Sequence, residues 1–302
     1  MAEAIALKGV FIPITTPFDP EDLVSREALR SNLARYNHTR LAGYVAAGST
    51  GEAVLLSMAE TEELWAAVVE ASAADKILVA GTAAESTTET ITRTRRAAAL
   101  GYAVALVRTP HYYRPQMTPA LLAEFYRRVA DASPIPILIY SIPQYTGVTV
   151  EAPLVAELAE HPNIVGIKDS SGSVQRAAEI VRATPAGFHV LVGSASTFFP
   201  ALAIGAAGGI MALADALPEE CVELYEAAVA GQYDRARNLQ ERLLPASSVL
   251  VSRYGVAGMK YALDQLGYYG GPVREPLRPL EEAAQREIKV VLAALKAQVA
   301  KQ

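Results

Sequence analysis

The chain has 302 residues, of which 51% are hydrophobic and 20% are charged, and its formal net charge is −5. This length and apolar content suffice for one large domain or two, and the mild negative charge argues against nucleic acid or an anionic membrane as a partner. Cys221 is the single cysteine, which excludes an internal disulfide and a thiolate metal cluster, and without a signal peptide or a long apolar run we expect a cytoplasmic protein.

In chain order, short apolar runs alternate with amphipathic helical runs. We expect strands at Gly9–Thr15, Gly43–Ala47, Ile77–Gly81, Ala103–Val107, Ile135–Tyr140, Ile164–Lys168, His189–Gly193 and Gly209–Leu213. Helix signals separate these strands: capping boxes at Ser57 with Glu60 and at Ser86 with Glu89, a cap and first-turn proline at Thr118-Pro119, and a helix end at Gly101.

This alternation of strand and helix predicts an α/β fold, a (β/α)8 TIM barrel, over residues 1–230. A doubly wound open sheet is the rival, although it needs a switch point and usually has fewer strands. No strand is expected after about Ala230, where Gln232–Val251, Val256–Leu266 and Leu280–Ala300 read as helices. We therefore predict a C-terminal helical extension, residues 231–302, packed on the barrel or on a neighbouring subunit.

Lys168 stands at the end of the expected strand Ile164–Lys168. An ammonium that leaves an apolar strand loses hydration, so its pKa falls and a neutral, nucleophilic amine becomes available. The alternative is a structural lysine that pairs with Asp169 or extends to water. The strand by itself leaves both interpretations open.

Other strand ends would bring polar side chains to the same rim, where barrel enzymes carry their chemistry. These segments are Thr15–Pro17, Gly48–Glu52, Thr109–Tyr113, Tyr140–Pro143, Lys168–Ser170 and Gly193–Ser194. The four histidines show no metal-ligand spacing, and no dinucleotide fingerprint or Walker loop is present. We therefore expect covalent or acid–base catalysis by side chains, with no metal and no cofactor.

Four motifs carry a resemblance to a known family. They are Gly9–Phe18 (GVFIPITTPF), Gly48–Glu52 (GSTGE), Tyr140–Pro143 with Thr146-Gly147, and Gly166–Asp169 (GIKD). In order and spacing, nearly end to end, the chain resembles the pyruvate-dependent class I aldolases, which include dihydrodipicolinate synthase, N-acetylneuraminate lyase and 4-hydroxy-2-oxoglutarate aldolase. The resemblance implies a homotetramer that acts on a small 2-oxo acid.

The resemblance also implies the site residues. Lys168 would form the Schiff base and Tyr140 would be the proton-transfer phenol. The remaining assignments are Ser49 and Thr50 for the pyruvate carboxylate, Gly193 and Ile210 for the pocket lining, and Tyr112 for a neighbouring subunit's site.

Elementary chemistry agrees with these roles. A neutral Lys168 can attack a keto carbon, and the resulting iminium is an electron sink that lets the C3–C4 bond break or form. A phenol can move the required proton, helped by a hydroxyl relay through Ser49 and Tyr112. The Ser49–Gly51 loop leads into a helix, so its amides can bind a carboxylate. Purely structural roles remain open for the same residues. Tyr140 could be a strand-end tyrosine whose hydroxyl is merely hydrogen-bonded, Tyr112 could be an aromatic residue of a subunit interface, and Ser49 and Thr50 could cap the next helix.

A serine hydrolase and an inactive regulator are the two alternatives from other function classes. Ala47–Gly51 nearly matches the nucleophile elbow of serine hydrolases, but that motif needs a histidine at the same rim, and His189 begins a strand at the opposite one. A catalytically inactive regulator on the same barrel would not need both Lys168 and Tyr140.

The aldehyde partner is suggested by a few positions. The synthases carry an arginine where this chain has Tyr145, and they favour two threonines where it has Ser49-Thr50. The tail Gly267–Leu277 and Ser141 resemble 4-hydroxy-2-oxoglutarate aldolases. A short partner could keep its carboxylate near Ser49, Ser170 and backbone amides. We therefore predict cleavage of 4-hydroxy-2-oxoglutarate to pyruvate and glyoxylate, with dihydrodipicolinate synthase or an N-acetylneuraminate-lyase-like aldolase as the alternatives.

Overall fold

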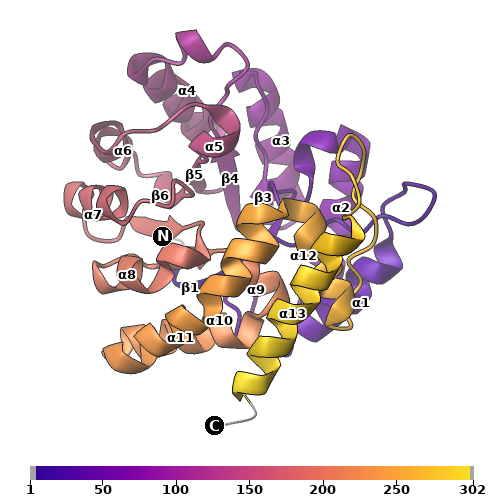
Figure 1. Ribbon diagram of the computed structural model, residues 1–302. Helices are drawn as coiled ribbons and strands as arrows, with labels where there is room; N and C mark the ends of the chain where they lie inside the picture. The colour runs from indigo at the N-terminus through magenta and orange to yellow at the C-terminus, as the bar shows by residue number, and fades with distance from the viewer. Residues whose placement is uncertain (1–4, 300–302) are drawn as a thin grey trace.

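A computed structural model describes residues 5–299 of the chain. Its parallel strands pair in sequence order and close on themselves, because β1 pairs with both β2 and β8 (Figure 1). The strands are β1 Gly9–Ile12, β2 Gly43–Ala46, β3 Ile77–Gly81, β4 Val104–Arg108, β5 Ile137–Ser141, β6 Ile164–Asp169, β7 His189–Val192 and β8 Gly208–Ile210. The predicted TIM barrel is confirmed, and an open doubly wound sheet is excluded.

Several strand ends differ from the prediction. β1 stops at Ile12 because Pro13 has no backbone N–H for the ladder, and β5 begins after Pro136 for the same reason. β8 stops at Ile210, and the chain then turns into the short helix α9, Leu213–Ala216. Ile14 and Met211, which the prediction placed in strands, are buried in loops at the rim, and hydrophobic periodicity does not distinguish a buried loop from a buried strand.

Helices alternate with the strands and surround the barrel (Figure 1). They are α1 Arg26–Tyr36, α2 Met58–Ala71, α3 Thr87–Ala99, α4 Pro119–Ala132, α5 Pro143–Thr146, α6 Ala152–Leu158, α7 Val174–Ala183, α8 Phe198–Ala203, α9 and α10 Pro218–Val229, with 3₁₀ turns η1 Ala53–Leu55, η2 Arg114–Gln116 and η3 Ala195–Thr197.

The helix signals were confirmed with one exception. Ser57 and Glu60 form a complete capping box at α2, and Thr118 caps α4. At α3 the Ser86 hydroxyl accepts from the Glu89 N–H, but the Glu89 carboxylate accepts a 2.9 Å hydrogen bond from Arg93 instead of returning to the cap. The capping box predicted there is wrong, because an i,i+4 arginine competes for the carboxylate.

The barrel interior is a closed apolar cluster. Its buried members are Leu7, Phe11, Val45, Val79, Val104, Leu106, Leu138, Tyr140, Ile142, Leu191 and Ile210. The narrow closure needs glycine in β8, since a Cβ on Gly208 would lie 2.0 Å from the Gly9 carbonyl oxygen. Tyr140 belongs to this cluster, so its phenol emerges from the packed interior at the rim.

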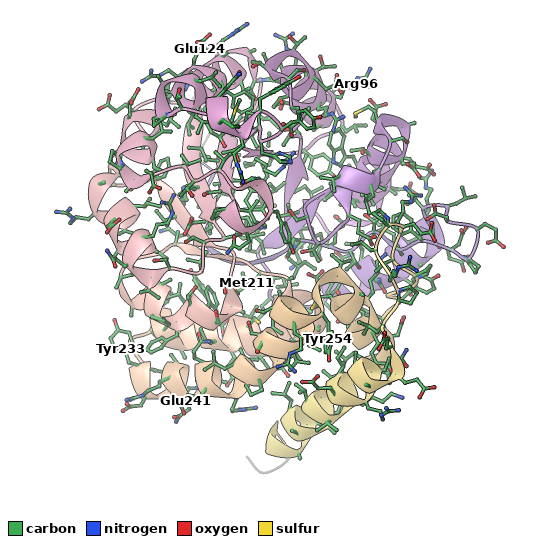
Figure 2. The ribbon with its side chains drawn as sticks, turned by 45° about the horizontal axis from the view of Figure 1, so that its top comes forward. Arg96, Glu124, Met211, Tyr233, Glu241 and Tyr254 are labelled. Carbon is green, nitrogen blue, oxygen red and sulfur yellow. The ribbon has the colours of Figure 1, made fainter. Side chains whose placement is uncertain are left out.

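After the barrel, all regular elements within residues 231–299 are helical. They are α11 Tyr233–Ala246, the π-helix η4 Ser247–Arg253, α12 Gly255–Gln265 and α13 Glu282–Val299, and α12 packs on α9, η4 and α13. Figure 1 shows α12 and α13 lying across one side of the barrel, and in Figure 2 the buried Met211 lies between the barrel and these helices, far from Arg96 and Glu124 at the periphery.

The single helix predicted for Gln232–Val251 is wrong in one respect. The α-helical hydrogen bonding ends at Ala246 and continues as the π-helix Ser247–Arg253. Pro245 lies just before this change and has no N–H to donate, which favours local rewinding. The division of the chain at residue 230 stays a prediction. Within residues 5–299, no helix is both long and apolar enough to cross a bilayer.

Candidate active site

Lys168 lies at the C-terminal end of β6, next to Tyr140 of β5 in the sheet register. Its side chain is only 4% exposed, and its Nζ lies 4.3 Å from the centroid of the Tyr140 ring. The two residues that the sequence singled out for nucleophile and phenol are therefore neighbours on adjacent strands. The parallel register brings them together although 28 positions separate them in the chain.

Asp169 is not the counterion of Lys168. Its carboxylate is buried and accepts hydrogen bonds from Arg176 Nε at 3.0 Å and from the Ser171 hydroxyl at 2.5 Å. The alternative in which Lys168 pairs with Asp169 is therefore wrong, because a residue on α7 already neutralises that carboxylate. Consecutive strand residues also point to opposite faces of the sheet.

Burial lowers the pKa of Lys168 to about 7, and only the charge of Asp215 opposes this shift. A charged ammonium is penalised by the loss of water, so a substantial neutral fraction exists near neutral pH. Asp215, on α9, is itself fully buried, and neither of its carboxylate oxygens has a hydrogen-bond partner among the described residues. Burial raises the pKa of Asp215 well above its usual range.

Tyr140 is buried and hydrogen-bonded within the site. Its hydroxyl and the Ser49 hydroxyl lie 3.2 Å apart. Burial raises the pKa of Tyr140, while hydrogen bonds with the hydroxyls of Ser49 and Ser170 act in the opposite direction. The phenol is therefore protonated at neutral pH and can donate a proton when a base forms beside it.

The Ser49–Gly51 loop is held from below by β1 and its extension. Thr16 donates from its hydroxyl to the Gly51 carbonyl at 2.6 Å, and a Cβ on Gly51 would lie 2.9 Å from the Ile14 carbonyl oxygen. The helix expected directly after this loop is only the 3₁₀ turn Ala53–Leu55, and α2 begins later, at Met58. Ser49 and Thr50 both line the cavity described next.

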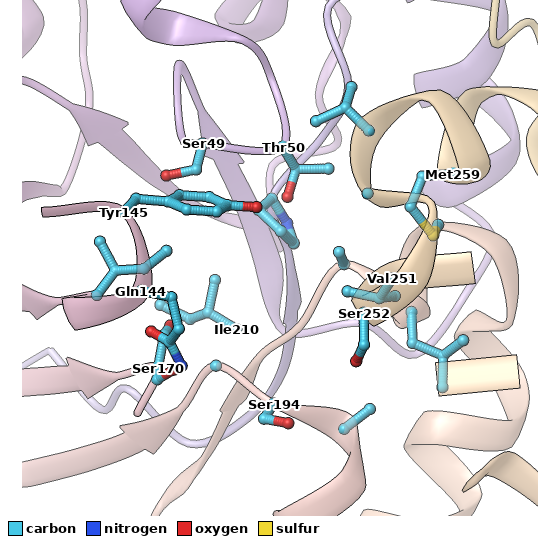
Figure 3. A pocket seen from close by; sticks show the side chains of 18 of the residues that line it. Ser49, Thr50, Gln144, Tyr145, Ser170, Ser194, Ile210, Val251, Ser252 and Met259 are labelled. Atoms are coloured by element: carbon cyan, nitrogen blue, oxygen red, sulfur yellow. Dashed lines mark hydrogen bonds between the residues drawn. The ribbon is translucent and has the colours of Figure 1, made fainter. Parts of the chain in front are cut away.

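A cavity of about 300 Å³ collects these side chains at the rim. Its lining includes the predicted residues Lys168, Tyr140, Ser49, Thr50, Tyr145, Ser170, Gly193 and Ile210. Figure 3 shows the Tyr145 ring extending between Ser49 and Thr50 on one side and Gln144, Ser170 and Ile210 on the other.

Ser170 and Gly193 depend on each other for space. A Cβ on Gly193 would lie 1.8 Å from the Ser170 Oγ, so only glycine at the end of β7 leaves room for this hydroxyl. Gln144 donates from its amide to the Ser170 carbonyl at 2.7 Å and joins the ends of β5 and β6. These contacts hold the hydroxyl of Ser170 at the floor of the cavity.

The opposite wall was not predicted from the sequence. It consists of residues of η3, η4 and α12: Ala195, Ser247, Val251, Ser252, Gly255, Val256 and Met259. In Figure 3, Val251, Ser252 and Met259 face Tyr145 across the cavity. They are small or apolar residues of a helical tail, and neither their type nor their spacing signals a site.

Tyr112 lies apart from the other predicted residues. It is 78% exposed, stacks edge-on against Tyr113 with a centroid distance of 5.2 Å, and is absent from the lining of the cavity within the described chain. Its N–H donates to the Glu85 carboxylate at 2.9 Å.

His189 begins β7, at the rim opposite Lys168, so it does not lie beside Ser49 as the histidine of a serine hydrolase would.

The match to a family model covers nearly the whole chain. The model of the dihydrodipicolinate synthetase family matches residues 6–295. The chain belongs to this family. Its members are lyases of the Schiff-base aldolase type, so the protein is an enzyme that makes or breaks a carbon–carbon bond of a pyruvate unit.

Individual relatives agree with the family. The 4-hydroxy-tetrahydrodipicolinate synthase of Methanothrix thermoacetophila is 37% identical over 286 residues, 94% of this chain and 96% of that protein. The enzyme of the same name from an Exiguobacterium species is 35% identical over 280 residues, covering 93% and 95%. The solved structure of the Methylacidiphilum fumariolicum SolV synthase superposes with a TM-score of 0.93 at 31% identity and covers 98% of each chain.

The pKa of Lys168 predicts a pH profile. Because only the neutral amine attacks, the rate of imine formation with pyruvate should rise with pH through about 7 and level off above about pH 8. Pre-steady-state borohydride trapping at a series of pH values measures this rate. A profile that is still rising steeply at pH 9 would mean that Lys168 keeps an ordinary lysine pKa and that its burial has no kinetic effect.

Proposed function

We propose that Lys168 is the Schiff-base nucleophile of a pyruvate-dependent aldolase and that Tyr140 transfers its protons. The observation that carries this proposal is the position of the buried Lys168 amine, which lines the cavity 4.3 Å from the centroid of the Tyr140 ring and has its pKa lowered to about 7. The family match supports the same chemistry.

The reaction follows from the groups present. Lys168 Nζ attacks the keto carbon of pyruvate, water leaves, and a protonated imine forms. Loss of a proton from the adjacent methyl group gives an enamine, whose carbon attacks an aldehyde and forms the new carbon–carbon bond. Tyr140 donates the proton that the aldehyde oxygen then needs, and Ser49, 3.2 Å away, relays it. Cleavage of a 4-hydroxy-2-oxo acid is the reverse sequence.

We infer that Ser49, Thr50 and the amides of Gly51 bind the pyruvate carboxylate. Ser49 and Thr50 line the cavity together with Lys168, and Gly51, which does not itself line it, follows them on the loop after β2. A carboxylate there would accept hydrogen bonds from the two hydroxyls and from backbone N–H groups, and no cation would be required. Gly193, Ile210 and Ser170 would then border the reacting carbon.

For the aldehyde, the first candidate is aspartate semialdehyde. Curated relatives that are 35–37% identical over more than nine-tenths of the chain carry the name 4-hydroxy-tetrahydrodipicolinate synthase. These comparisons favour the synthase reaction over the cleavage of 4-hydroxy-2-oxoglutarate that the sequence suggested first.

One observation still supports the second candidate. Among the described residues that line the cavity, Lys168 carries the only cationic side chain, and Tyr145 stands where the synthases carry arginine. A neutral phenol is a weaker partner for the carboxylate of aspartate semialdehyde than a bidentate guanidinium. A short aldehyde such as glyoxylate keeps its carboxylate near the reacting carbon and depends less on a cation at position 145.

We also propose that the protein is a homotetramer in which Tyr112 enters a neighbouring site. Tyr112 and Tyr113 are 78% and 65% exposed, and Val54, which is 76% exposed, lines a second cavity together with His111, the residue before Tyr112. Exposed aromatic and apolar side chains that gather in this way are typical of subunit contacts.

The phenol prediction separates binding from proton transfer. Tyr140→Phe should still give a pyruvate-derived mass on Lys168 after borohydride reduction, but its kcat should fall by roughly 10²–10⁴-fold because a positioned acid–base group is lost. Lys168→Arg should give neither label nor turnover, since a guanidinium stays protonated. Label on another lysine, or wild-type turnover of Tyr140→Phe, would refute these assignments.

The substrate prediction compares two reactions on one preparation. We expect a higher kcat/KM for condensation of pyruvate with aspartate semialdehyde than for cleavage of 4-hydroxy-2-oxoglutarate. Tyr145→Arg should raise the first value about tenfold, since a charged hydrogen bond contributes about 1.5–3 kcal/mol. Tyr145→Phe is the matched control without a donor. If the wild type prefers 4-hydroxy-2-oxoglutarate, the second candidate replaces the first.

The assembly prediction concerns Tyr112. Tyr112→Phe should lower kcat while the variant stays folded and oligomeric, because only the hydroxyl is lost from the neighbouring site. Tyr113→Phe is the matched control. Light scattering gives the mass and steady-state assays give kcat; a fully active monomer would exclude the shared site.

A further inference from the structure

We propose that Glu52 and Lys260 act as a pair of positioning residues that fix the distance between two walls of the active-site cavity and thereby set its affinity for the substrate carboxylate. The inference rests on the proposed function, in which the loop of Ser49 and Thr50 binds that carboxylate. Neither Glu52 nor Lys260 lines the cavity in the described chain, so neither is a catalytic residue.

The pair is an ion pair in the protein interior. Lys260 Nζ lies 2.5 Å from Glu52 Oε1, and the two side chains are 1% and 0% exposed. Among the described residues, the Lys260 ammonium is the group that compensates the charge of Glu52 Oε1. Two charges removed from water in this way are tolerated only because each neutralises the other.

Further contacts hold both partners in place. Lys260 donates to the Pro272 carbonyl at 2.7 Å, and its ammonium lies 4.4 Å from the centroid of the Phe18 ring. The second Glu52 oxygen accepts from the Arg274 N–H at 2.8 Å. The pair therefore also ties down the segment between α12 and α13, which Arg274 anchors again through Glu60 at 2.7 Å.

Each partner is adjacent to one wall of the cavity. Glu52 follows the carboxylate-binding loop directly and has a left-handed backbone with φ 55°, a conformation that disfavours a side chain unless something holds it. Lys260 follows Met259, and Met259, Val256 and Gly255 of α12 form the opposite wall. Figure 3 shows Thr50 and Met259 on these two walls.

The arrangement has a mechanical consequence. Thr50 and Glu52 are two positions apart, and Met259 and Lys260 are consecutive. A fixed distance between the charged groups of Glu52 and Lys260 therefore also fixes the distance between the two walls of the cavity. Other contacts between the barrel and the helical region combine apolar packing with hydrogen bonds, such as those from Asn32 to the Tyr269 carbonyl and from Gln240 to the Ala195 carbonyl, both at 2.8 Å. The Glu52–Lys260 pair differs from these in joining two buried charges directly, next to both walls of the cavity.

The test separates positioning from stability with four variants. Lys260→Met and Glu52→Gln each leave one uncompensated partner, whereas the double variant Glu52→Gln/Lys260→Met leaves none. Lys76→Met is the matched control, because Lys76 is also buried, donates to the Thr39 and Leu41 carbonyls at 2.8 and 3.1 Å, and lies at the opposite end of the barrel. Each purified protein is assayed for KM, kcat, melting temperature and borohydride trapping.

We expect both single variants to have a lower melting temperature and a KM for pyruvate raised at least about tenfold, with a smaller change in kcat. The double variant should regain much of the melting temperature but keep the raised KM, since the charge is balanced while the distance is no longer fixed. Lys76→Met should lose melting temperature at unchanged KM. If a single variant does not fold, the double variant still decides.

Two results would overturn the proposal: a wild-type KM in the double variant, or a KM in Lys76→Met that rises in parallel with its loss of stability. Trapping keeps this failure distinct from failure of the proposed function. If pyruvate does not label Lys168 in the wild type, the Schiff-base assignment fails; if it labels the wild type and all variants bind pyruvate equally, only the positioning role fails.

Discussion

The site depends on one constraint, the burial of the Lys168 ammonium without a dedicated counterion. Its pKa falls from 10.5 to about 7, which corresponds to roughly 5 kcal/mol of differential interaction between the charged and neutral forms. This unfavourable free energy arises at the end of β6, where pairing with β5 on one side and β7 on the other holds the strand in place. Asp169, the adjacent carboxylate, does not neutralise the amine, because it is paired with Arg176.

The cavity around this amine is assembled from two parts of the chain. Strand ends and the loops that follow them supply the amine of Lys168, the phenol of Tyr140 and the hydroxyls of Ser49 and Ser170, the groups for which we propose the chemistry. The helical region supplies the wall opposite them, through the π-helix η4 and α12. π-helical turns often occur at functional sites because the extra residue per turn widens the helix and changes which side chains face the cavity. Here the change places Ser247, Val251 and Ser252 along the wall.

The two halves of the proposed reaction rely on different parts of the fold. The residues that we propose for pyruvate are Lys168, Tyr140 and the loop that Thr16 fastens through Gly51, all of them on or next to strands. The residue that we propose for the aldehyde is Tyr145 on the short helix α5, and the described lining residues include no cation besides Lys168. Rigid strands preserve one chemistry, while loop side chains change the partner, as in other barrels.

The barrel, and the position of Lys168 and Tyr140 at strand ends on one rim, followed from the sequence alone; that the two are neighbours came from the register of β5 and β6. These features depend on local signals, an apolar run of strand length and a polar residue where that run stops, and a closed parallel sheet gathers all such ends at one rim. The family resemblance added the roles of Ser49, Thr50, Gly193 and Ile210, positions that have no distinguishing local signal.

Only the tertiary structure decided how the rim is completed. Three interactions complete it: the ion pairs of Asp169 with Arg176 and of Glu52 with Lys260, and the effect of the Asp215 charge on the pKa of Lys168. They join residues that lie up to 208 positions apart in the chain. The lining by η4 and α12 likewise depends on how the helical region packs against the barrel. Packing of apolar faces is non-directional, so periodicity reveals that a helix is amphipathic but not which wall it will form.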